Sequence, residues 1–301
     1  LCEIYGAGGW DLRFEDMKRI GDWLGVLGVN LFDEHLSYAT LRGARKRDHP
    51  QSFSYHEPWW EAYHVNARYL TRLSYALSQG EQINDVLVLE PTTTAWMYQG
   101  NEARLKELGD AFFNLLMALE VAQVEYDIGD EDIIARHGAN AGARLVVGQR
   151  HYTTLVLPPG TENLDAPTLK IIEEFLRRGG TVLSCSEPPA RVDGTISERG
   201  VALARSKSWR RVEASAVPAQ MRAAAGPDGF AIHRQPGDKG ILFHQRRQLA
   251  DGQLLFLVNT SIDQSSAGTV EVSLHGVEQW DLATGKTDAV AFEKTAQGVR
   301  T

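Results

Sequence analysis

Short apolar segments alternate with amphipathic stretches from the beginning of the chain. A strand-like segment occupies residues 1–6, and apolar residues then recur every three or four positions over 11–27, which predicts a helix. A second short strand is predicted at 29–32 and a second helix at 59–79, after the long polar loop of residues 33–58. The order strand, helix, strand, loop, helix is typical of a parallel α/β barrel or sheet.

A stricter alternation marks the next part of the chain, residues 81–189. The run at 86–89 is apolar throughout, as in strands that are buried on both faces of a sheet. Further strand-like segments follow, among them 143–148, and amphipathic helices are predicted at 102–119 and 164–180. Strands that alternate with helices over this length predict a flavodoxin-like open parallel sheet.

The last part of the chain, residues 190–301, changes character again. The segment 190–229 has no clear pattern, and we expect it to pack between domains. From residue 230 onward, short strand-like segments are separated by the turn dipeptides Asp-Gly at 251–252 and Thr-Gly at 284–285. This pattern predicts a β-sandwich or another β-rich accessory domain.

Charge and composition narrow the range of partners. The chain has 301 residues and a formal net charge of −8, which argues against nucleic acid or an anionic membrane as the main partner. Four basic residues fall within 42–47, but one cluster on an acidic chain does not indicate nucleic-acid binding. No apolar run approaches the roughly 18–20 residues that span a bilayer. A neutral ligand such as a sugar is compatible with this balance.

The two cysteines and the first residue say little about location. Cys2 and Cys185 lie far apart in unlike contexts, which excludes a disulfide framework and a cysteine-rich zinc site. No signal peptide is visible, but the chain opens on Leu1 rather than methionine, directly on a strand. We therefore expect a fragment or a processed product, and leave localisation open between the bacterial cytoplasm and a secreted or periplasmic site.

The end of the first predicted strand carries side chains that suit sugar chemistry. Glu3 is followed by a small-residue turn at 6–9, with Tyr5 and Trp10 on either side. A glutamate here is a candidate for proton transfer or for attack on an anomeric carbon. The aromatic rings are candidates for stacking on a sugar face. The alternative is that Glu3 is a surface carboxylate near a frayed terminus.

The end of the second predicted strand is equally polar. Asn30, Asp33, Glu34, His35 and Tyr38 follow one another within nine residues. We expect hydrogen bonds from some of these side chains to sugar hydroxyls, since alternation would turn part of them toward a barrel mouth. Asp33, Glu34 and His35 are also candidate metal ligands, although three adjacent residues do not easily face one ion. A polar loop before the next helix is the alternative.

The aromatic pair Trp59 and Trp60 begins the second predicted helix, just after Pro58. Two adjacent tryptophans beside His56 and Glu57 indicate either a packed helix start or a platform for a sugar ring. We take Trp59 as a candidate for facing a pocket.

The middle part lacks the marks of an active enzyme. No glycine-rich phosphate loop follows its first strand. Cys185 follows a strand, as an amidotransferase nucleophile would, but without the flanking glycines of a nucleophile elbow. We therefore interpret residues 81–189 as a structural domain or an oligomer surface.

Together these motifs resemble one known family. ExYGxxGW at 3–10, GVNLFDEHLSY at 28–38, and a WW helix that ends in a glycine before a DV strand, at 58–86, occur in that order. The order is similar to the C-terminal barrel segment of the family 106 glycoside hydrolases, the α-L-rhamnosidases and their relatives. The resemblance covers about residues 1–95. The later parts are similar, at the level of fold, to accessory domains of large glycosidases, including the trimerisation-like domain of some β-galactosidases.

The resemblance implies a fold class of α/β plus β. Residues 1–80 are expected to form the end of a (β/α)8 barrel, residues 81–189 a flavodoxin-like domain, and residues 190–301 a C-terminal β-sandwich. It also implies that Glu3 is the catalytic strand-end carboxylate and that Asn30 and His35 bind substrate. No cofactor is implied, although a structural Ca²⁺ stays open.

The same resemblance implies an incomplete enzyme. Glycosidases need two carboxylates across the sugar, held by a barrel of eight strands, and this sequence supplies about two strands. The partner carboxylate is expected upstream, with Glu34 and Glu57 as alternatives, so the chain alone is expected to hydrolyse little or nothing. The loop SFSYHEP departs from the family pattern, which leaves the sugar open. The main alternative is a non-catalytic module for carbohydrate binding or assembly, and exposed barrel edges favour a homo-oligomer.

Overall fold

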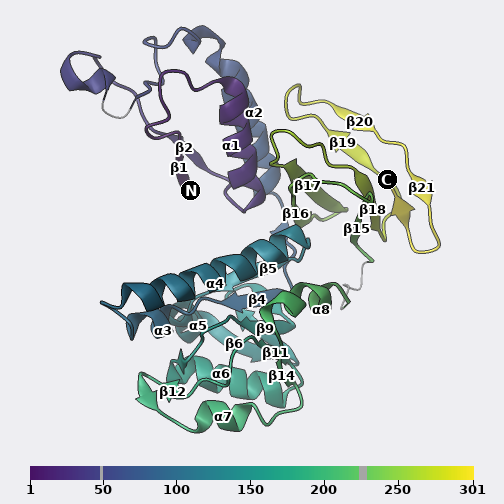
Figure 1. Ribbon diagram of the computed structural model, residues 1–301. Coiled ribbons are helices and arrows are strands. Elements are labelled where there is room, and N and C mark those ends of the chain that lie inside the picture. Colours follow the sequence, from purple (N-terminus) through teal and green to yellow (C-terminus); the bar gives the residue numbers. More distant parts are fainter. Residues whose placement is uncertain (48–49, 224–228) are drawn as a thin grey trace. The chain divides into compact units, whose positions relative to one another are not determined.

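The computed structural model describes residues 1–47, 50–223 and 229–301 (Figure 1). Asp48 and His49 of the predicted polar loop, and residues 224–228 of the segment without a clear pattern, lie outside this description. The described residues form two compact units, one from residues 1–83 and 229–301 and the other from residues 84–223. Residues from both ends of the chain therefore share one unit.

The first unit begins with two parallel strands and two helices. Strand β1 (Cys2–Ile4) pairs with β2 (Phe32–Glu34), while α1 (Phe14–Val26) and α2 (Tyr63–Ser78) pack against each other. The chain thus has the predicted order of strand, helix, strand and helix. Buried Ile4 and Met17 belong to one hydrophobic cluster, so α1 lies against the face of the strands that carries Ile4.

The second strand begins later than the sequence pattern predicts. Gly28 has a left-handed φ of +105° directly after α1. Its N–H donates to the carbonyl of Gly25, and the N–H of Val29 donates to the carbonyl of Leu24. These two bonds are the Schellman cap of a helix C-terminus. Val29 therefore closes the helix, and the predicted strand at 29–32 is corrected to Phe32–Glu34.

An antiparallel sheet from the end of the chain packs against the two helices. It consists of β17 (Gln253–Asn259), β16 (Leu242–Gln248) and the short β3 (Glu81–Gln82). Leu254 and Phe256 of β17 pack on the buried leucines of α2, which are Leu70, Leu73 and Leu77. The side-chain amide of Gln245 donates to the carbonyl of Gly25 in α1 at 3.3 Å.

Further antiparallel strands complete the first unit. Those of one four-stranded sheet are β15 (Ala231–Arg234), β18 (Gly268–Val272), β22 (Val299–Arg300) and β21 (Glu293–Lys294). A separate hairpin pairs β19 (Glu278–Trp280) with β20 (Thr287–Ala289). Asp238 ties this region together, since its carboxylate accepts from Arg234, from Ser266 and from the N–H groups of Gly240 and Ala267. These bonds, led by the one from Arg234, hold the pKa of Asp238 well below its usual range.

A five-stranded parallel sheet forms the middle of the second unit. Its strands, in spatial order, are β14 (Trp209–Arg211), β11 (Thr181–Ser184), β9 (Thr154–Leu157), β4 (Val86–Leu89) and β5 (Tyr126–Gly129). All four pairings are parallel. The order along the chain is therefore 2-1-3-4-5 when counted from the β5 edge. The sheet takes in β14, beyond residue 189.

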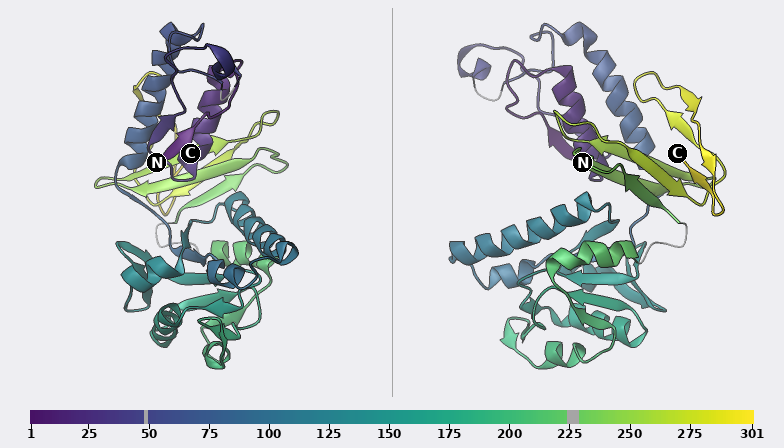
Figure 2. Two further views of the ribbon diagram at one scale, coloured as in Figure 1. Left: turned by 90° about the vertical axis from the view of Figure 1, so that its left-hand side faces the viewer. Right: turned by 45° about the vertical axis from the view of Figure 1, so that its right-hand side comes forward.

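Helices cover both faces of this sheet (Figure 2). Val86 and Val88 pack with α4 (Glu102–Val121) and α8 (Val217–Ala223), whereas Leu87 and Leu89 pack with α5 (Glu131–His137) and α6 (Ala166–Arg177). The apolar run at 86–89 is thus buried on both sides, as its lack of alternation predicts. The shorter helices are α3 (Thr92–Trp96) and α7 (Arg199–Leu203).

Two small sheets flank the parallel one. An antiparallel meander consists of β6 (Gly138–Ala141), β7 (Arg144–Val147) and β8 (Arg150–Tyr152). The other small sheet consists of β10 (Asn163–Leu164), β12 (Arg191–Val192) and β13 (Thr195–Ile196). The strand-like segment at 143–148 therefore belongs to the meander and not to the parallel sheet. Only Leu145 of β7 is fully buried, which is enough for a flanking strand but not for a central one.

We predict that Gly80→Ala strongly destabilises the first unit. Gly80 has a φ of +57°, and a Cβ there would lie 1.9 Å from the carbonyl oxygen of Gln248, at the β3–β16 pairing. The left-handed backbone alone costs about 1–2 kcal/mol for alanine, and the overlap adds to it. Urea unfolding should show that the free energy of unfolding falls by more than about 2 kcal/mol.

The matched control for this change is Gly237→Ala in the same unit. Gly237 also has a positive φ, +82°, but an added Cβ meets nothing within 4 Å. The free energy of unfolding of Gly237→Ala should therefore fall by only about 1–2 kcal/mol, the cost of the left-handed backbone. Equal losses in the two variants would contradict the close approach at Gly80.

Candidate active site

The register of β1 and β2 decides which side chains meet. Glu3 lies beside Asp33, and Ile4 lies beside Glu34. Side chains alternate along a strand, so Glu3 and Asp33 share one face while Ile4 and Glu34 share the other. Ile4 is buried in the cluster with Met17 of α1, whereas Glu3 and Asp33 are exposed. The helices therefore cover the Ile4 face, and the acidic pair lies on the opposite face.

The imidazole of His35 accompanies Glu3 on this face. Its Nε2 lies 3.7 Å from Oε1 of Glu3, within ion-pair distance when the ring is protonated. The backbone N–H of His35 donates to the carbonyl of Ile4 at 2.9 Å, which continues the parallel ladder by one residue. The side chain of Glu3 is 63% exposed and that of His35 only 21%, so the ring is mostly covered and the carboxylate is accessible. A basic group beside an accessible carboxylate is an arrangement that can transfer protons.

Glu34 lies on the other face and is already bonded. Its Oε1 accepts from the hydroxyl of Tyr63 in α2 at 2.6 Å, and the ring of Trp60 stacks on Tyr63 at 5.6 Å. Burial, reinforced by the Glu34 carboxylate, raises the pKa of Tyr63. The structure therefore does not bring Glu34 together with Glu3. Sequence reasoning missed this role of Tyr63, because its position in the apolar stripe of the helix hid the hydroxyl.

Tyr5 and Trp59 belong to an aromatic cluster. Tyr5 has a φ of +66°, and its buried ring stacks on Phe53 with centroids 5.7 Å apart. Its hydroxyl donates to the carbonyl of Met17 at 2.8 Å. Trp59 is half-buried and lies 5.6–5.7 Å from the rings of Phe14, Phe53 and Tyr63, which the structure places around it. Both side chains thus pack against α1 and α2.

The other predicted site residues lie in loops near the strand ends. The indole of Trp10 donates to the carbonyl of Lys46 at 2.7 Å, and the N–H of Tyr38 donates to Oγ of Ser52 at 3.0 Å. Asn30 is exposed at the entry to β2. Among the described residues, His35 is the predicted site residue that lies within ion-pair distance of Glu3.

Glu57, considered above as a partner carboxylate, is buried beside the same loops. Only 4% of the residue is exposed, and its Oε1 accepts from the N–H of Ser52 at 3.4 Å. Its Oε2 has no hydrogen-bond partner among the described residues. Burial raises the pKa of Glu57. A buried carboxyl group of this kind is retained more readily as the neutral acid than an exposed one.

The part of the chain that the structure describes contains neither a metal-ligand cluster nor a helix suited to a membrane. No group of three or more histidine, cysteine, aspartate or glutamate side chains in residues 1–47, 50–223 and 229–301 is arranged to hold a metal ion. Over the same residues, no helix combines the length and apolar character that crossing a membrane requires.

We predict that Tyr63→Phe destabilises the first unit by about 1–3 kcal/mol, because the half-buried carboxylate of Glu34 loses the hydrogen bond that the Tyr63 hydroxyl donates to it. Urea unfolding measures the loss. The control is Tyr75→Phe on the same helix, where 65% of the residue is exposed, and it should change the free energy of unfolding by less than about 0.5 kcal/mol. Equal effects in the two variants would show that the Glu34 bond contributes nothing.

The buried tyrosines make the protein sensitive to alkali. Burial is the largest cause that raises the pKa of five phenols, those of Tyr5, Tyr63, Tyr69, Tyr126 and Tyr152. A folded pKa above the unfolded one means that the folded state holds these protons more tightly. Stability is therefore unaffected below the unfolded pKa of about 10 and falls as the pH rises above it.

Phenolate absorbance during an alkaline titration tests this prediction. The five phenols with a raised pKa should ionise only together with unfolding, as followed by circular dichroism. Ionisation of these five phenols without unfolding would contradict the prediction.

Solved structures share this fold. The rhamnosidase from Novosphingobium sp. PP1Y is 19% identical, with a TM-score of 0.68 over 98% of this chain and 29% of the rhamnosidase chain. A GH42 β-galactosidase from G. stearothermophilus is 11% identical, with a TM-score of 0.57 over 86% of this chain and 46% of its own. At these identities the likeness shows the fold alone.

A curated relative and a family model extend the comparison to sequence. A putative beta-glucuronidase from Formosa agariphila is 26% identical over 186 residues, which are 59% of this chain and 14% of that protein. This chain therefore spans less than half of each of these relatives. The model of glycoside hydrolase family 106, described as alpha-L-rhamnosidase, matches residues 4–294. With nearly all of its length matched, the chain belongs to glycoside hydrolase family 106.

Proposed function

We propose that the chain is part of a glycoside hydrolase in which Glu3 acts as acid/base or nucleophile on a glycosidic bond. One observation carries the proposal. Glu3 stands at the carboxyl end of a parallel strand, accessible, with the His35 ring 3.7 Å away, on the face opposite the helices. In a (β/α)8 barrel that face is the interior, and the carboxyl ends of the strands hold the chemistry.

The finer architecture belongs to the same proposal. β1 and β2 with α1 and α2 are the last part of a (β/α)8 barrel. The strand order 2-1-3-4-5 of the parallel sheet supports a flavodoxin-like second unit. The antiparallel sheets of residues 229–301 are the accessory β-sandwich, packed on the outer side of the barrel helices.

The substrate of the proposed site is a carbohydrate. His35 positions the Glu3 carboxylate, while Asn30, Trp10 and Tyr38 on the neighbouring loops bind sugar hydroxyls or a sugar face. The remaining candidates Tyr5, Glu34 and Trp59 act indirectly in this proposal. Their side chains are engaged with the helices, so they fix the loops that carry the binding groups.

A second carboxylate is required on the other side of the sugar. Glu34 faces α2 and Glu57 is buried, so neither supports that role from its present position. We therefore place the second carboxylate on barrel strands other than β1 and β2. The coverage of only 29% of the Novosphingobium rhamnosidase chain is in keeping with this assignment.

Hydrolysis of a panel of aryl glycosides tests the proposal. The 301-residue chain should give no turnover above the buffer rate. The complete reading frame that contains it should be active, and Glu3→Gln should lower its kcat by about 100-fold or more, as expected for loss of an acid–base group. The control Glu15→Gln changes an exposed glutamate in the first turn of α1 and should leave kcat unchanged.

Two outcomes would contradict the proposal in different ways. Full activity of Glu3→Gln in the complete protein would remove Glu3 from the chemistry. Turnover by the 301-residue chain itself, lost in Glu3→Gln, would keep the site and overturn the requirement for further strands.

A further inference from the structure

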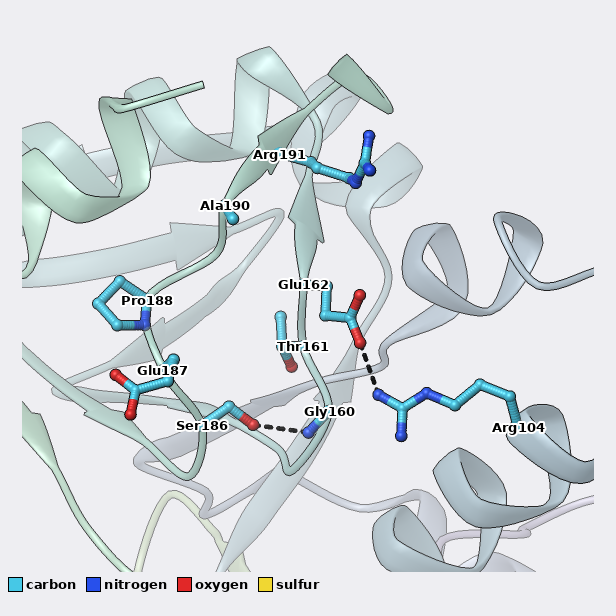
Figure 3. Close-up of a pocket in the computed structure, with 9 residues that line it drawn as sticks. All are labelled: Arg104, Gly160, Thr161, Glu162, Ser186, Glu187, Pro188, Ala190 and Arg191. Atoms are coloured by element: carbon cyan, nitrogen blue, oxygen red, sulfur yellow. Dashed lines mark hydrogen bonds and ion pairs between the residues drawn. The ribbon is translucent and has the colours of Figure 1, made fainter. Parts of the chain in front are cut away.

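A cavity of about 360 Å³ lies in the second unit, apart from Glu3 and His35. Two loops form most of its wall: residues 160–162, beyond β9, and residues 186–191, beyond β11. Arg104 of α4 completes the lining (Figure 3). Both loops leave the carboxyl ends of parallel strands, which is where open α/β sheets bind their ligands. The volume falls in the range of small-molecule sites.

Hydrogen bonds hold the first loop in a fixed shape. Oγ1 of Thr94 accepts from the N–H groups of both Glu162 and Asn163, at 3.1 and 3.0 Å. The N–H of Gly160 donates to Oγ of Ser186 at 2.6 Å, which joins the two loops. Gly160 has a φ of +81°, and a Cβ there would lie 2.3 Å from Leu108 of α4. The cavity wall is therefore preorganised rather than formed by a loose surface loop.

Both acidic side chains that line the cavity, Glu162 and Glu187, already form ion pairs with arginines. The carboxylate of Glu162 accepts from Arg104 at 2.5 Å and from the hydroxyl of Tyr98 at 2.6 Å. Glu187 forms an ion pair with Arg211. These pairs fix Glu162 and Arg104 in place, and they leave lone pairs of the carboxylate available for further donors.

Among the charged residues that line the cavity, Arg191 is the one for which the described residues supply no ion pair. It lies half-buried on β12, and its side chain donates to a neutral group, the carbonyl of Gly194, at 2.9 Å. Within the described residues, no carboxylate forms an ion pair with it. Figure 3 shows the Arg191 and Glu162 side chains extending to the same side, with Glu162 directed at Arg104 and Arg191 on the far side of Glu162 from Arg104. The cavity thus presents one uncompensated guanidinium beside a fixed carboxylate.

We propose that this cavity binds a sugar acid, with the ligand carboxylate on Arg191 and its hydroxyls on Glu162 and Arg104. A guanidinium fork binds a carboxylate through two parallel hydrogen bonds. The lining contains no aromatic side chain and only Pro188 and Ala190 as apolar ones, which disfavours an aromatic acid. A polyhydroxylated acid of monosaccharide size matches the charge and the volume of the cavity.

Isothermal titration of the whole chain with galacturonate tests the proposal. Galacturonate should bind saturably, whereas galactose, which lacks the carboxylate, should bind at least about tenfold more weakly, the loss expected for a charge-assisted hydrogen bond. Arg191→Gln should weaken galacturonate binding by a similar factor. The control Arg199→Gln, an exposed arginine on α7 outside the cavity, should bind like the unchanged chain.

Further outcomes keep the test decisive. Arg191→Lys retains the charge but not the fork, so it should bind with intermediate affinity even where Arg191→Gln folds poorly by circular dichroism. No saturable binding of galacturonate, equal binding of galactose, or equal competition by inorganic sulfate would each overturn the proposal. None of these results depends on glycoside hydrolysis by Glu3.

Discussion

The parallel register between β1 and β2 is the constraint from which the geometry of the candidate active site follows. It pairs Glu3 with Asp33 and Ile4 with Glu34. A shift by one residue would send Glu3 toward the helices and expose Ile4, because side chains alternate strictly along a strand. The register is fixed by burial of Ile4 and by the bond between Glu34 and Tyr63, so packing on one face determines which charges are accessible on the other.

The turn after β1 places the next residues beside the side chains that the register brings together. Tyr5 occupies a left-handed conformation that L-residues adopt at a cost, and its buried ring and its bond to Met17 offset that cost. The turn then brings Gly6 beside the ring of His35, where a Cβ would lie 3.6 Å from Cγ. A core residue therefore sets the path of the loop that carries the catalytic candidate. Tyr5 is predicted from the sequence to stack on a sugar, and in the structure its ring is buried against Phe53.

Sequence reasoning succeeded where burial dictates the pattern. The helices α1, α4 and α6 and the central strand β4 follow directly from apolar periodicity. It failed where a helix cap, a short edge strand or a single hydrogen bond determines the structure. The Schellman cap at Gly28 delayed β2, and the edge strand β14 buries only Trp209, which leaves almost no apolar signal. At the site, proximity of Glu3 and His35 followed from the strand order. The orientation of Glu34 depends on the hydroxyl of Tyr63 on α2, and a pattern of apolar positions does not reveal such a bond.

In the second unit, buried polar side chains fix the positions of the loops at the carboxyl edge of the parallel sheet. Glu131, 3% exposed at the start of α5, accepts from the hydroxyl of Thr93 and from the N–H of Asp165. One carboxylate thus joins the segments that follow β4, β5 and β9 at the carboxyl edge of the sheet. Burial outweighs these bonds and raises the pKa of Glu131, so the group is kept for its geometry at an electrostatic cost.

Thr94, the residue after Thr93, also joins two segments of the second unit. Its hydroxyl oxygen accepts from the backbone N–H groups of Glu162 and Asn163. These two bonds hold the backbone beside the cavity in one conformation. Within the described residues, no carboxylate forms an ion pair with the guanidinium of Arg191, which lies on the same cavity wall. In both units a rigid strand end therefore presents a charged side chain whose partner the fold does not supply in full, which is the condition under which a ligand gains most from binding there.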